Sequence, residues 1–218
     1  MAIKQSERIN VELGQSGYYI ALKRKFILFN PVMDDLLNRI SQGRFEVLDV
    51  GMGPALITER LLEGTENRCS FVGVDIEEKW SGYVAELISR WGNRLKFIIN
   101  ASNNLPFRDG SFNMVVSVNS LHHFKYPEVM IHEMLRVLRE SGICVIYDYN
   151  PASFKLKLLR YILTIKGYIV RNSASRAFLD SINSSYSSSF LKEMFLDAGI
   201  GKYSISKKGI FNIVILAK

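Results

Sequence analysis

The 218-residue sequence is poor in the residues that form covalent or metal cross-links. It has two cysteines, Cys69 and Cys144, in or beside apolar runs, so we expect buried thiols in a reducing compartment and no disulfide. Three histidines without metal-ligand spacing, apart from the adjacent His122 and His123, predict no metal site. No apolar run is long enough to cross a membrane, and the first residues lack the apolar centre of a secretory signal. We therefore expect a cytoplasmic protein.

The most informative segment present is residues 47–55, V-L-D-V-G-M-G-P-A. Its apolar run contains Asp49 near the end, and Gly51 and Gly53 follow before a helical pattern, which predicts a buried strand, a tight turn and a helix. In an open α/β sheet this turn lies at the carboxyl end of the strands, where nucleotide-like ligands bind. A dinucleotide fingerprint would need glycine at Leu56, and an acid at the strand end would repel a phosphate. The turn therefore favours a nucleoside that carries positive charge.

Four more apolar runs follow, over residues 71–75, 95–100, 112–118 and 143–148. Nearly continuous apolar strands separated by helical stretches predict a parallel sheet that is covered on both faces. Asp75 ends the second run, 22 residues after Gly53. That distance suits an acid that accepts hydrogen bonds from both ribose hydroxyls.

In order and spacing, residues 45–150 resemble the class I S-adenosylmethionine-dependent methyltransferases, in the small-molecule branch that includes the ubiquinone and menaquinone methyltransferases. The resemblance is carried by residues 47–55, 72–75, 100–109, 111–124 and 133–139 followed by Gly142. It implies an α/β, Rossmann-like, doubly wound fold. Its seven-stranded sheet would be mostly parallel, with helices on both faces and an antiparallel C-terminal hairpin.

The resemblance implies S-adenosylmethionine as the cofactor and assigns ten residues to it. They are Asp49, Gly51, Met52, Gly53, Asp75, Ile76, Asn100, Ala101, Ser117 and Asn119. The glycine turn would pass under the methionine part, and Asp49 would bind its ammonium group through water. Asp75 would hold the ribose and Ile76 would pack on the adenine.

The remaining assignments concern the adenine edge and the sulfonium. Asn100 and Ala101 would meet the adenine edge, and Ser117 and Asn119 would line the sulfonium side. Asn100 stands where relatives usually have an aspartate, but its amide can both accept and donate hydrogen bonds.

Two further departures from the family pattern lie in and beyond the turn. Ala55 stands where a third glycine is usual, and Asn113 replaces a common aspartate. We expect Pro54 to lie favourably at the start of the following helix.

Methyl transfer needs alignment, exclusion of water and, for a hydroxyl acceptor, a base. His122 and His123 follow the fourth strand and are the candidate catalytic residues, with one of them as the base. An equally good interpretation is that the pair is a loop feature that packs under the cover. Tyr147 and Asp148 are alternative groups on the acceptor side, and Asp148 could equally cap the next turn.

We expect one domain over residues 1–218. Its parts are an N-terminal helical cover over 1–44 broken at Asn30-Pro31, a cofactor core over 45–150, a helical insertion over 151–185 above the substrate site, and a C-terminal helix and hairpin over 186–218. In the last part we expect Ser187–Ser189 to cap a helix from Phe190 to Ala198 and the hairpin to turn at Lys208-Gly209. In the core we expect Pro127 to begin a helix and Gly142 to begin the fifth strand.

The positive charge of +7 is concentrated near the C-terminus. Residues 152–218 carry eleven Lys and Arg against three acids, whereas the first 151 residues are nearly neutral. A basic amphipathic cover, over residues 18–29 and 154–168, favours an apolar substrate with an anionic group, or contact with an anionic membrane surface. Solvated charges on packed helices explain most of these residues equally well. No aromatic–basic motif supports a nucleic-acid partner.

Three functions are compatible with these patterns. The first is an enzyme that methylates a small hydrophobic or amphiphilic molecule. The second is a non-catalytic protein of the same fold that acts as a binding or assembly partner, which Ala55 and Asn100 would favour. The third is a dinucleotide-dependent oxidoreductase, which Asp49 and Leu56 disfavour.

Overall fold

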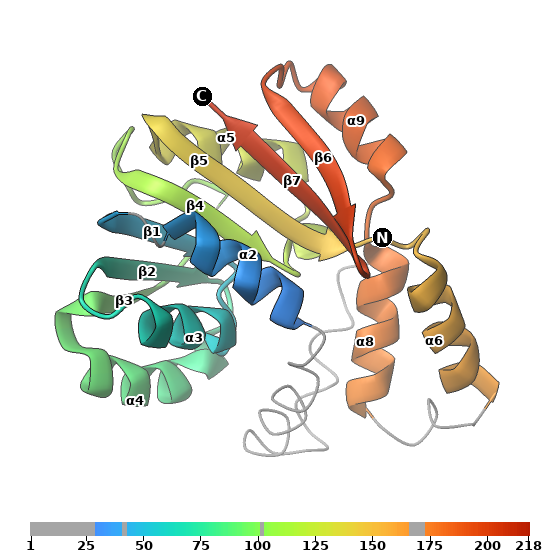
Figure 1. Cartoon of the computed structure of the whole chain (residues 1–218), viewed down its shortest axis with the longest axis horizontal. Coiled ribbons are helices and arrows are strands. Elements are labelled where there is room, and N and C mark those ends of the chain that lie inside the picture. The colour runs from blue at the N-terminus through green and yellow to red at the C-terminus, as the bar shows by residue number, and fades with distance from the viewer. Residues whose placement is uncertain (1–28, 41–42, 101–102, 166–172) are drawn as a thin grey trace.

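A seven-stranded sheet organises the computed structural model, which describes residues 29–40, 43–100, 103–165 and 173–218 (Figure 1). Within these residues the strand order is β3-β2-β1-β4-β5-β7-β6, and β7 is the only strand that runs against the direction of the others. The strands are β1 (Phe45–Val50), β2 (Cys69–Asp75), β3 (Leu95–Ile99), β4 (Phe112–Val118), β5 (Leu138–Tyr149), β6 (Tyr203–Lys208) and β7 (Phe211–Ala217). The predicted sheet and its C-terminal hairpin are confirmed, and Gly209 forms the hairpin turn with φ 62°.

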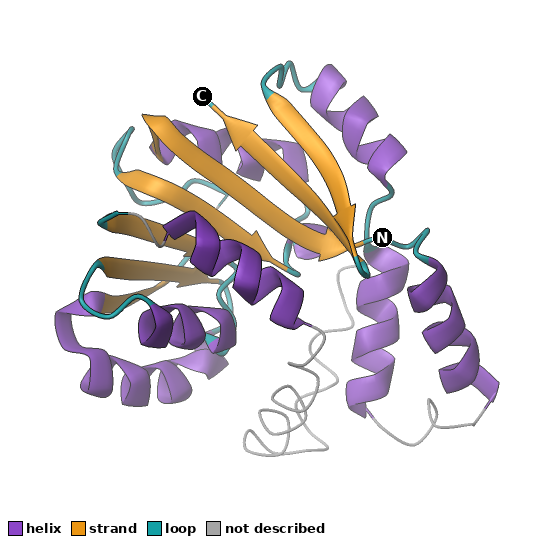
Figure 2. Cartoon of the chain, in the orientation of Figure 1, coloured by secondary structure: helices purple, strands orange, loops and turns teal. Residues whose placement is uncertain are grey.

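Helices cover both faces of the sheet and one of its ends (Figure 2). The described helices are α2 (Asn30–Ile40), α3 (Leu56–Gly64), α4 (Ser81–Trp91), α5 (Pro127–Val137), α6 (Phe154–Ile165), α8 (Ser173–Ser184) and α9 (Ser188–Asp197), with 3-10 turns η3 (Glu78–Trp80), η4 (Gly92–Arg94) and η5 (Leu121–His123). α2, α3 and α4 pack on one face, and α5 and α9 on the other. α6 and α8 lie beyond the carboxyl end of β5. None of the described helices combines the length and apolarity needed to cross a bilayer.

Each central strand is buried on both sides, which explains its uninterrupted apolar sequence. In β1, Val47 belongs to the core under α2 and α3, and the next residue, Leu48, belongs to the core under α5. Both cysteines are buried free thiols, as expected. Burial raises the pKa of the Cys144 thiol to about 12, which makes the thiol unreactive at neutral pH.

Several predicted boundaries hold and two are wrong. α5 begins at Pro127, and the Ser187 hydroxyl caps α9 by accepting from the Phe190 N–H at 3.2 Å. β5, however, begins at Leu138 rather than Gly142, because Leu138 is buried and pairs with Phe112 before the register shifts. Gly142 lies inside the strand, where a Cβ would come within 2.8 Å of the Asn113 carbonyl oxygen.

The second wrong boundary is at Pro54, which does not begin a helix. α3 begins at Leu56, and Ala55 precedes it in the left-handed conformation, with φ 57° and ψ 24°. Positive φ recurs at Gly51, Gly53 and Ala55, so the turn places every second residue in a region that favours glycine. This left-handed backbone explains why the family pattern usually has a third glycine where this chain has Ala55.

We expect Ala55→Gly to stabilise the protein. Glycine adopts φ 57° without the strain of a Cβ, which offsets the loss of a buried methyl group, so the free energy of unfolding should rise by about 0.5 kcal/mol. Ala85→Gly, on the exposed side of α4, is the matched control and should lower it by about 1 kcal/mol. Urea denaturation measures both, and equal losses would contradict the strain argument.

Candidate functional site

The glycine turn after β1 has one closed and one open side. A Cβ on Gly51 would come within 2.5 Å of Ser120, whose hydroxyl donates to the Gly51 carbonyl at 2.9 Å. A Cβ on Gly53 would meet no atom within 4 Å. Gly51 is thus required by contact with the segment after β4, whereas Gly53 leaves backbone surface that a ligand can approach.

Two carboxylates stand beside this turn, near the ends of the neighbouring strands β1 and β2. Asp75 accepts from the Gly53 N–H at 2.7 Å and from the Glu77 N–H at 2.9 Å. Asp49 is only 3% exposed and accepts from the Thr58 hydroxyl at 2.6 Å. Burial, together with the charge of Asp75, raises the pKa of Asp49 to about 7 against the effect of Thr58. This pair suits a ligand with positive charge, because a cation would favour the ionised form of Asp49.

The ends of β2 and β3 bring the predicted adenine residues together. Ile76 is 63% exposed, which is unusual for a large apolar side chain directly after a core strand. The Asn100 N–H donates to the Asp75 carbonyl at 2.9 Å, and its side-chain amide donates to the Asn104 carbonyl at 3.0 Å. Ala101 lies outside the described residues.

Some buried polar atoms without a partner lie near the carboxyl end of β4 and in the segment after it. As well as Ser81 Oγ and Trp91 Nε1 of α4, the described residues with a buried side-chain atom that makes no hydrogen bond include Ser117 (Oγ), Asn119 (Oδ1) and His122 (Nε2). Asn119 has φ 56°, and its N–H donates to the Tyr147 carbonyl at 2.7 Å, so the chain turns sharply here. Because buried polar groups are normally paired, these atoms mark the place where a polar ligand fits.

His122 and His123 have different environments. His122 is buried, and its Nδ1 lies 2.7 Å from Asp148 Oδ1, whereas His123 is exposed. Asp148 also accepts from the N–H groups of His122 and Tyr149 and from the hydroxyl of Ser185, which directly follows α8. Because an ionised carboxylate only accepts, we assign the hydrogen of the neutral ring to Nδ1, which leaves a lone pair on Nε2.

Two side chains lie elsewhere than the sequence suggested. The Tyr147 hydroxyl donates to Asp35 of α2, under the opposite set of helices, so Tyr147 is not an acceptor-side group. The Met52 side chain is buried against Gly73 of β2, so only the Met52 main chain faces the turn. Adjacent residues of a strand point to opposite faces, which is why Asp148 reaches His122 and Tyr147 does not.

Three contributors were missed by sequence reasoning. Thr58 supports Asp49, Ser120 holds the glycine turn, and Ser185 contacts Asp148. Thr58 had a usable signal, since it lies in the first turn of the helix that follows the glycine turn. The sequence holds no comparable signal for Ser120 and Ser185, because their hydrogen-bond partners lie 69 and 37 residues away.

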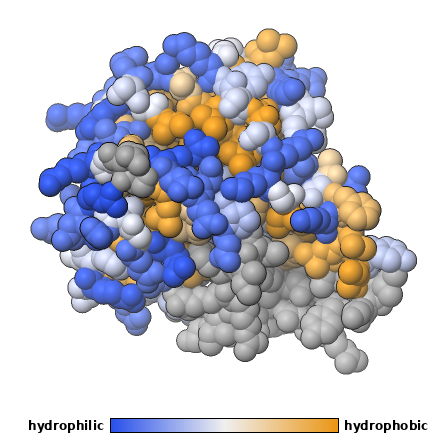
Figure 3. Space-filling view, viewed as in Figure 1, coloured by the Kyte–Doolittle hydropathy of each residue, from blue (hydrophilic) through white to orange (hydrophobic). Residues whose placement is uncertain are grey.

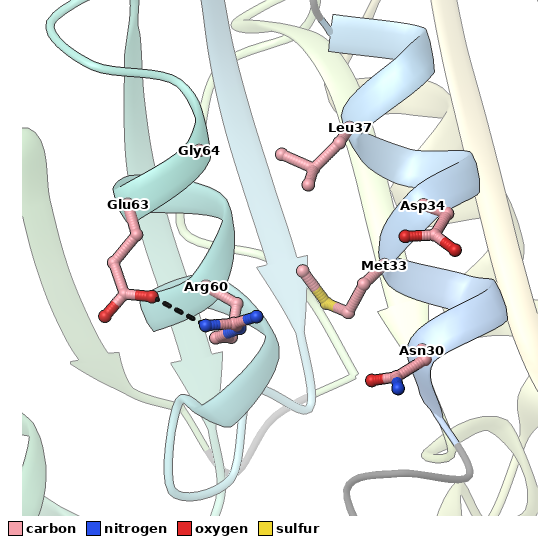
Figure 4. Close-up of a pocket in the computed structure, with 7 residues that line it drawn as sticks. All are labelled: Asn30, Met33, Asp34, Leu37, Arg60, Glu63 and Gly64. Atoms are coloured by element: carbon pink, nitrogen blue, oxygen red, sulfur yellow. Dashed lines mark hydrogen bonds and ion pairs between the residues drawn. The ribbon is translucent and has the colours of Figure 1, made fainter.

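A separate cavity of about 420 Å³ lies between α2 and α3 (Figure 4). Asn30, Met33, Asp34, Leu37, Arg60, Glu63 and Gly64 line it. It contains none of the predicted site residues, and its Arg60–Glu63 ion pair of 3.2 Å joins two residues on the same helix. We therefore place the functional site at the carboxyl edge of the sheet.

Residues 48–146 match the family described as a methyltransferase domain. This part of the chain resembles the class I S-adenosylmethionine-dependent methyltransferases. The match covers the glycine turn, both carboxylates and η5. The cofactor predicted from the sequence, S-adenosylmethionine, is the one this family implies, and the residues fit it: an open glycine turn, two carboxylates, an exposed apolar side chain and unpaired buried oxygens.

Known methyltransferases are similar to this chain over different shares of its length. The ubiquinone/menaquinone biosynthesis C-methyltransferase UbiE of Laribacter hongkongensis is 24% identical over 84% of this chain and 82% of its own. An uncharacterized methyltransferase of Mycobacterium sp. (strain KMS) is 33% identical, but the match spans 46% of this chain and 37% of the mycobacterial one. This second similarity therefore covers less than half of either chain.

Solved methyltransferases share the fold over nearly the whole chain. A SAM-dependent methyltransferase of Aquifex aeolicus superposes with a TM-score of 0.66 at 16% identity, over 96% of both chains. A putative S-adenosyl-L-methionine-dependent methyltransferase of Methanococcus maripaludis gives 0.68 at 17% identity, over 95% and 94%. The methyltransferase domain and the helices around it thus form an arrangement seen in other members of the fold.

Proposed function

We propose that this protein transfers a methyl group by in-line displacement from S-adenosylmethionine to a small hydrophobic or amphiphilic acceptor. The observation that carries the proposal is a set of unpaired buried atoms, Ser117 Oγ, Asn119 Oδ1 and His122 Nε2, at the end of β4 and in the segment that follows it. Oxygen lone pairs there would face the positive sulfonium of the cofactor. When bound, the cofactor supplies a methyl group on a sulfur that leaves as a neutral thioether.

The remaining cofactor contacts follow from the two carboxylates. Each Asp75 oxygen accepts one backbone N–H and keeps a lone pair for a ribose hydroxyl. Asp49 would bind the ammonium group, and the exposed Ile76 would pack on the adenine ring. Asn100 lies beside them and would meet the adenine edge.

His122 is the proposed base. An acceptor hydroxyl would lose its proton to Nε2 as the new bond to carbon forms, and Asp148 would hold the ring and stabilise the imidazolium. The exposed His123 is the weaker candidate, because no carboxylate contact in the described residues orients its ring.

The apolar character of the acceptor is supported by aromatic rings near His122. Tyr149 lies 6.4 Å from the His122 ring, between centroids. Tyr149 in turn stacks on Phe211 and meets Phe178 of α8 edge to face at 5.5 Å. The name of the Laribacter relative, a ubiquinone/menaquinone biosynthesis C-methyltransferase, agrees with an acceptor of this kind.

The direct test is titration calorimetry of the purified protein. We expect heat from S-adenosylmethionine and none from a nicotinamide dinucleotide. No heat from either would favour the non-catalytic alternative. Mass spectrometry of hydroquinones incubated with protein and cofactor then tests the acceptor class, and a hydroquinone with an alkyl tail should be methylated faster than one without.

We expect cofactor affinity to depend on pH through Asp49. Because its pKa in the free protein is about 7, the carboxyl is protonated at lower pH, and binding a cation must then expel the proton. Affinity should therefore fall by up to about tenfold per pH unit below pH 7 and stay level up to about pH 8, where the ammonium group of the cofactor begins to lose its own proton. Calorimetry across this range measures the effect. Asp49→Asn, which removes the titrating group, should bind more weakly with a flatter profile.

A further inference from the structure

α6 carries an apolar stripe that faces away from the rest of the protein. Phe154 is 77% exposed, Leu158 46%, Tyr161 63% and Ile162 40%. Their spacing of four, three and one places them on one side of a helix with about 100° per residue. Leu156, on the other side, is fully buried. Figure 3 shows hydrophobic side chains at the right edge of the molecule, where Figure 1 places α6.

Lysines border this stripe on both sides. At about 100° per residue, Lys155 follows Ile162 around the helix and Lys157 precedes Tyr161. Both lysines are exposed, and α6 contains no acidic residue. The chain from residue 152 onwards carries eleven basic residues against three acids. An apolar strip with aromatic residues and lysines at its margins is the pattern of a helix that lies in the surface of a bilayer.

The position of α6 connects this surface to the site. The Arg160 guanidinium donates to the Asn183 side chain of α8 at 3.2 Å, and α8 ends near Ser185, which contacts Asp148. α6 therefore lies on the same edge of the sheet as His122.

We propose that α6 docks on an anionic bilayer surface, with its apolar stripe in the headgroup region and its lysines on the lipid phosphates. None of the described helices can cross a membrane, so the contact is peripheral. The inference goes beyond the proposed function: membrane docking would present amphiphilic acceptors to the site, but it requires neither cofactor nor catalysis.

The test is flotation of the whole protein with vesicles of phosphatidylglycerol and phosphatidylcholine in equal parts, without cofactor. We expect binding to these vesicles and much weaker binding to phosphatidylcholine alone. Phe154→Ala with Leu158→Ala should lower the partition coefficient at least about tenfold, because interfacial binding scales with buried apolar area. Lys155→Gln with Lys157→Gln should lower it roughly 25-fold, about fivefold for each lysine.

Two matched controls come from surfaces away from α6. Phe190→Ala with Leu196→Ala removes one exposed Phe and one exposed Leu from α9, and Lys192→Gln with Lys207→Gln removes the same charge. Both should partition like the parent protein, and circular dichroism confirms that each variant is folded.

Three results would overturn the proposal: no binding to the mixed vesicles, equal binding to neutral vesicles, or equal losses in the α6 and control variants. Light scattering identifies the main rival. A dimer that dissociates in the Phe154→Ala, Leu158→Ala variant, without vesicle binding by the parent, would assign the stripe to a second copy. Cofactor binding is measured separately by calorimetry and does not depend on the vesicle assay. Membrane docking and the proposed function can therefore fail independently of each other.

Discussion

Asp75→Ala should weaken S-adenosylmethionine binding by at least a hundredfold. The substitution removes the proposed acceptor for both ribose hydroxyls and also frees the N–H groups of Gly53 and Glu77. Two hydrogen bonds to a charged group contribute about 3 kcal/mol, and the released Gly53 N–H adds disorder at the turn. Titration calorimetry at constant pH measures the change.

The controls separate a lost contact from a lost fold. Asp109→Ala removes an exposed acid far from the glycine turn and should leave affinity unchanged. Asp75→Asn keeps one side-chain acceptor and should fall between the parent and the alanine variant. Parent-like affinity in a folded Asp75→Ala protein would show that the ribose lies elsewhere.

His122→Asn should lower kcat about a thousandfold while cofactor affinity stays within about twofold. The asparagine amide can still donate to Asp148 from near the position of Nδ1, so the buried carboxylate keeps its partner. What the variant lacks is the Nε2 lone pair that would take the acceptor's proton. Steady-state methylation of a hydroquinone, combined with calorimetry, separates kcat from binding.

His123→Ala is the matched control for this prediction and should retain nearly full activity, because no carboxylate contact among the described residues orients that ring as Asp148 orients His122. Asp148→Asn should reduce kcat about a hundredfold and alter the pH–rate profile, since the amide can no longer stabilise the imidazolium. If His122 is purely structural, His122→Asn should lower the stability of the protein and leave the pH profile of the remaining activity unchanged. Undiminished turnover in His122→Asn would remove the base from the mechanism.

Local motifs accounted for much of the fold and for the cofactor side of the site. The parallel sheet follows from apolar runs separated by helical stretches, and Asp49, Gly51 and Asp75 stand near strand ends that periodicity can locate. The backbone angle of Ala55 could not be predicted in this way. A sequence shows that alanine replaces a glycine, but not that the turn holds it at φ 57°.

The acceptor side was harder to predict because its contacts are distant in sequence. Tyr147 and Asp148 are neighbours in β5, and only the strand register decides which of them faces His122. His122 and His123 are likewise adjacent, and the difference between them comes from a carboxylate 26 residues away. The periodicity of strands and helices shows which face a side chain occupies, but it does not show which distant residue that side chain contacts.

Ser120 connects the glycine turn on the cofactor side of the site with His122 on the acceptor side. It binds the Gly51 carbonyl and stands two residues before His122 in the chain. Inserting or deleting residues in this loop would shift the histidine and the glycine turn together. Attempts to redirect the enzyme toward new acceptors should therefore graft changes onto α8 and leave the loop length untouched.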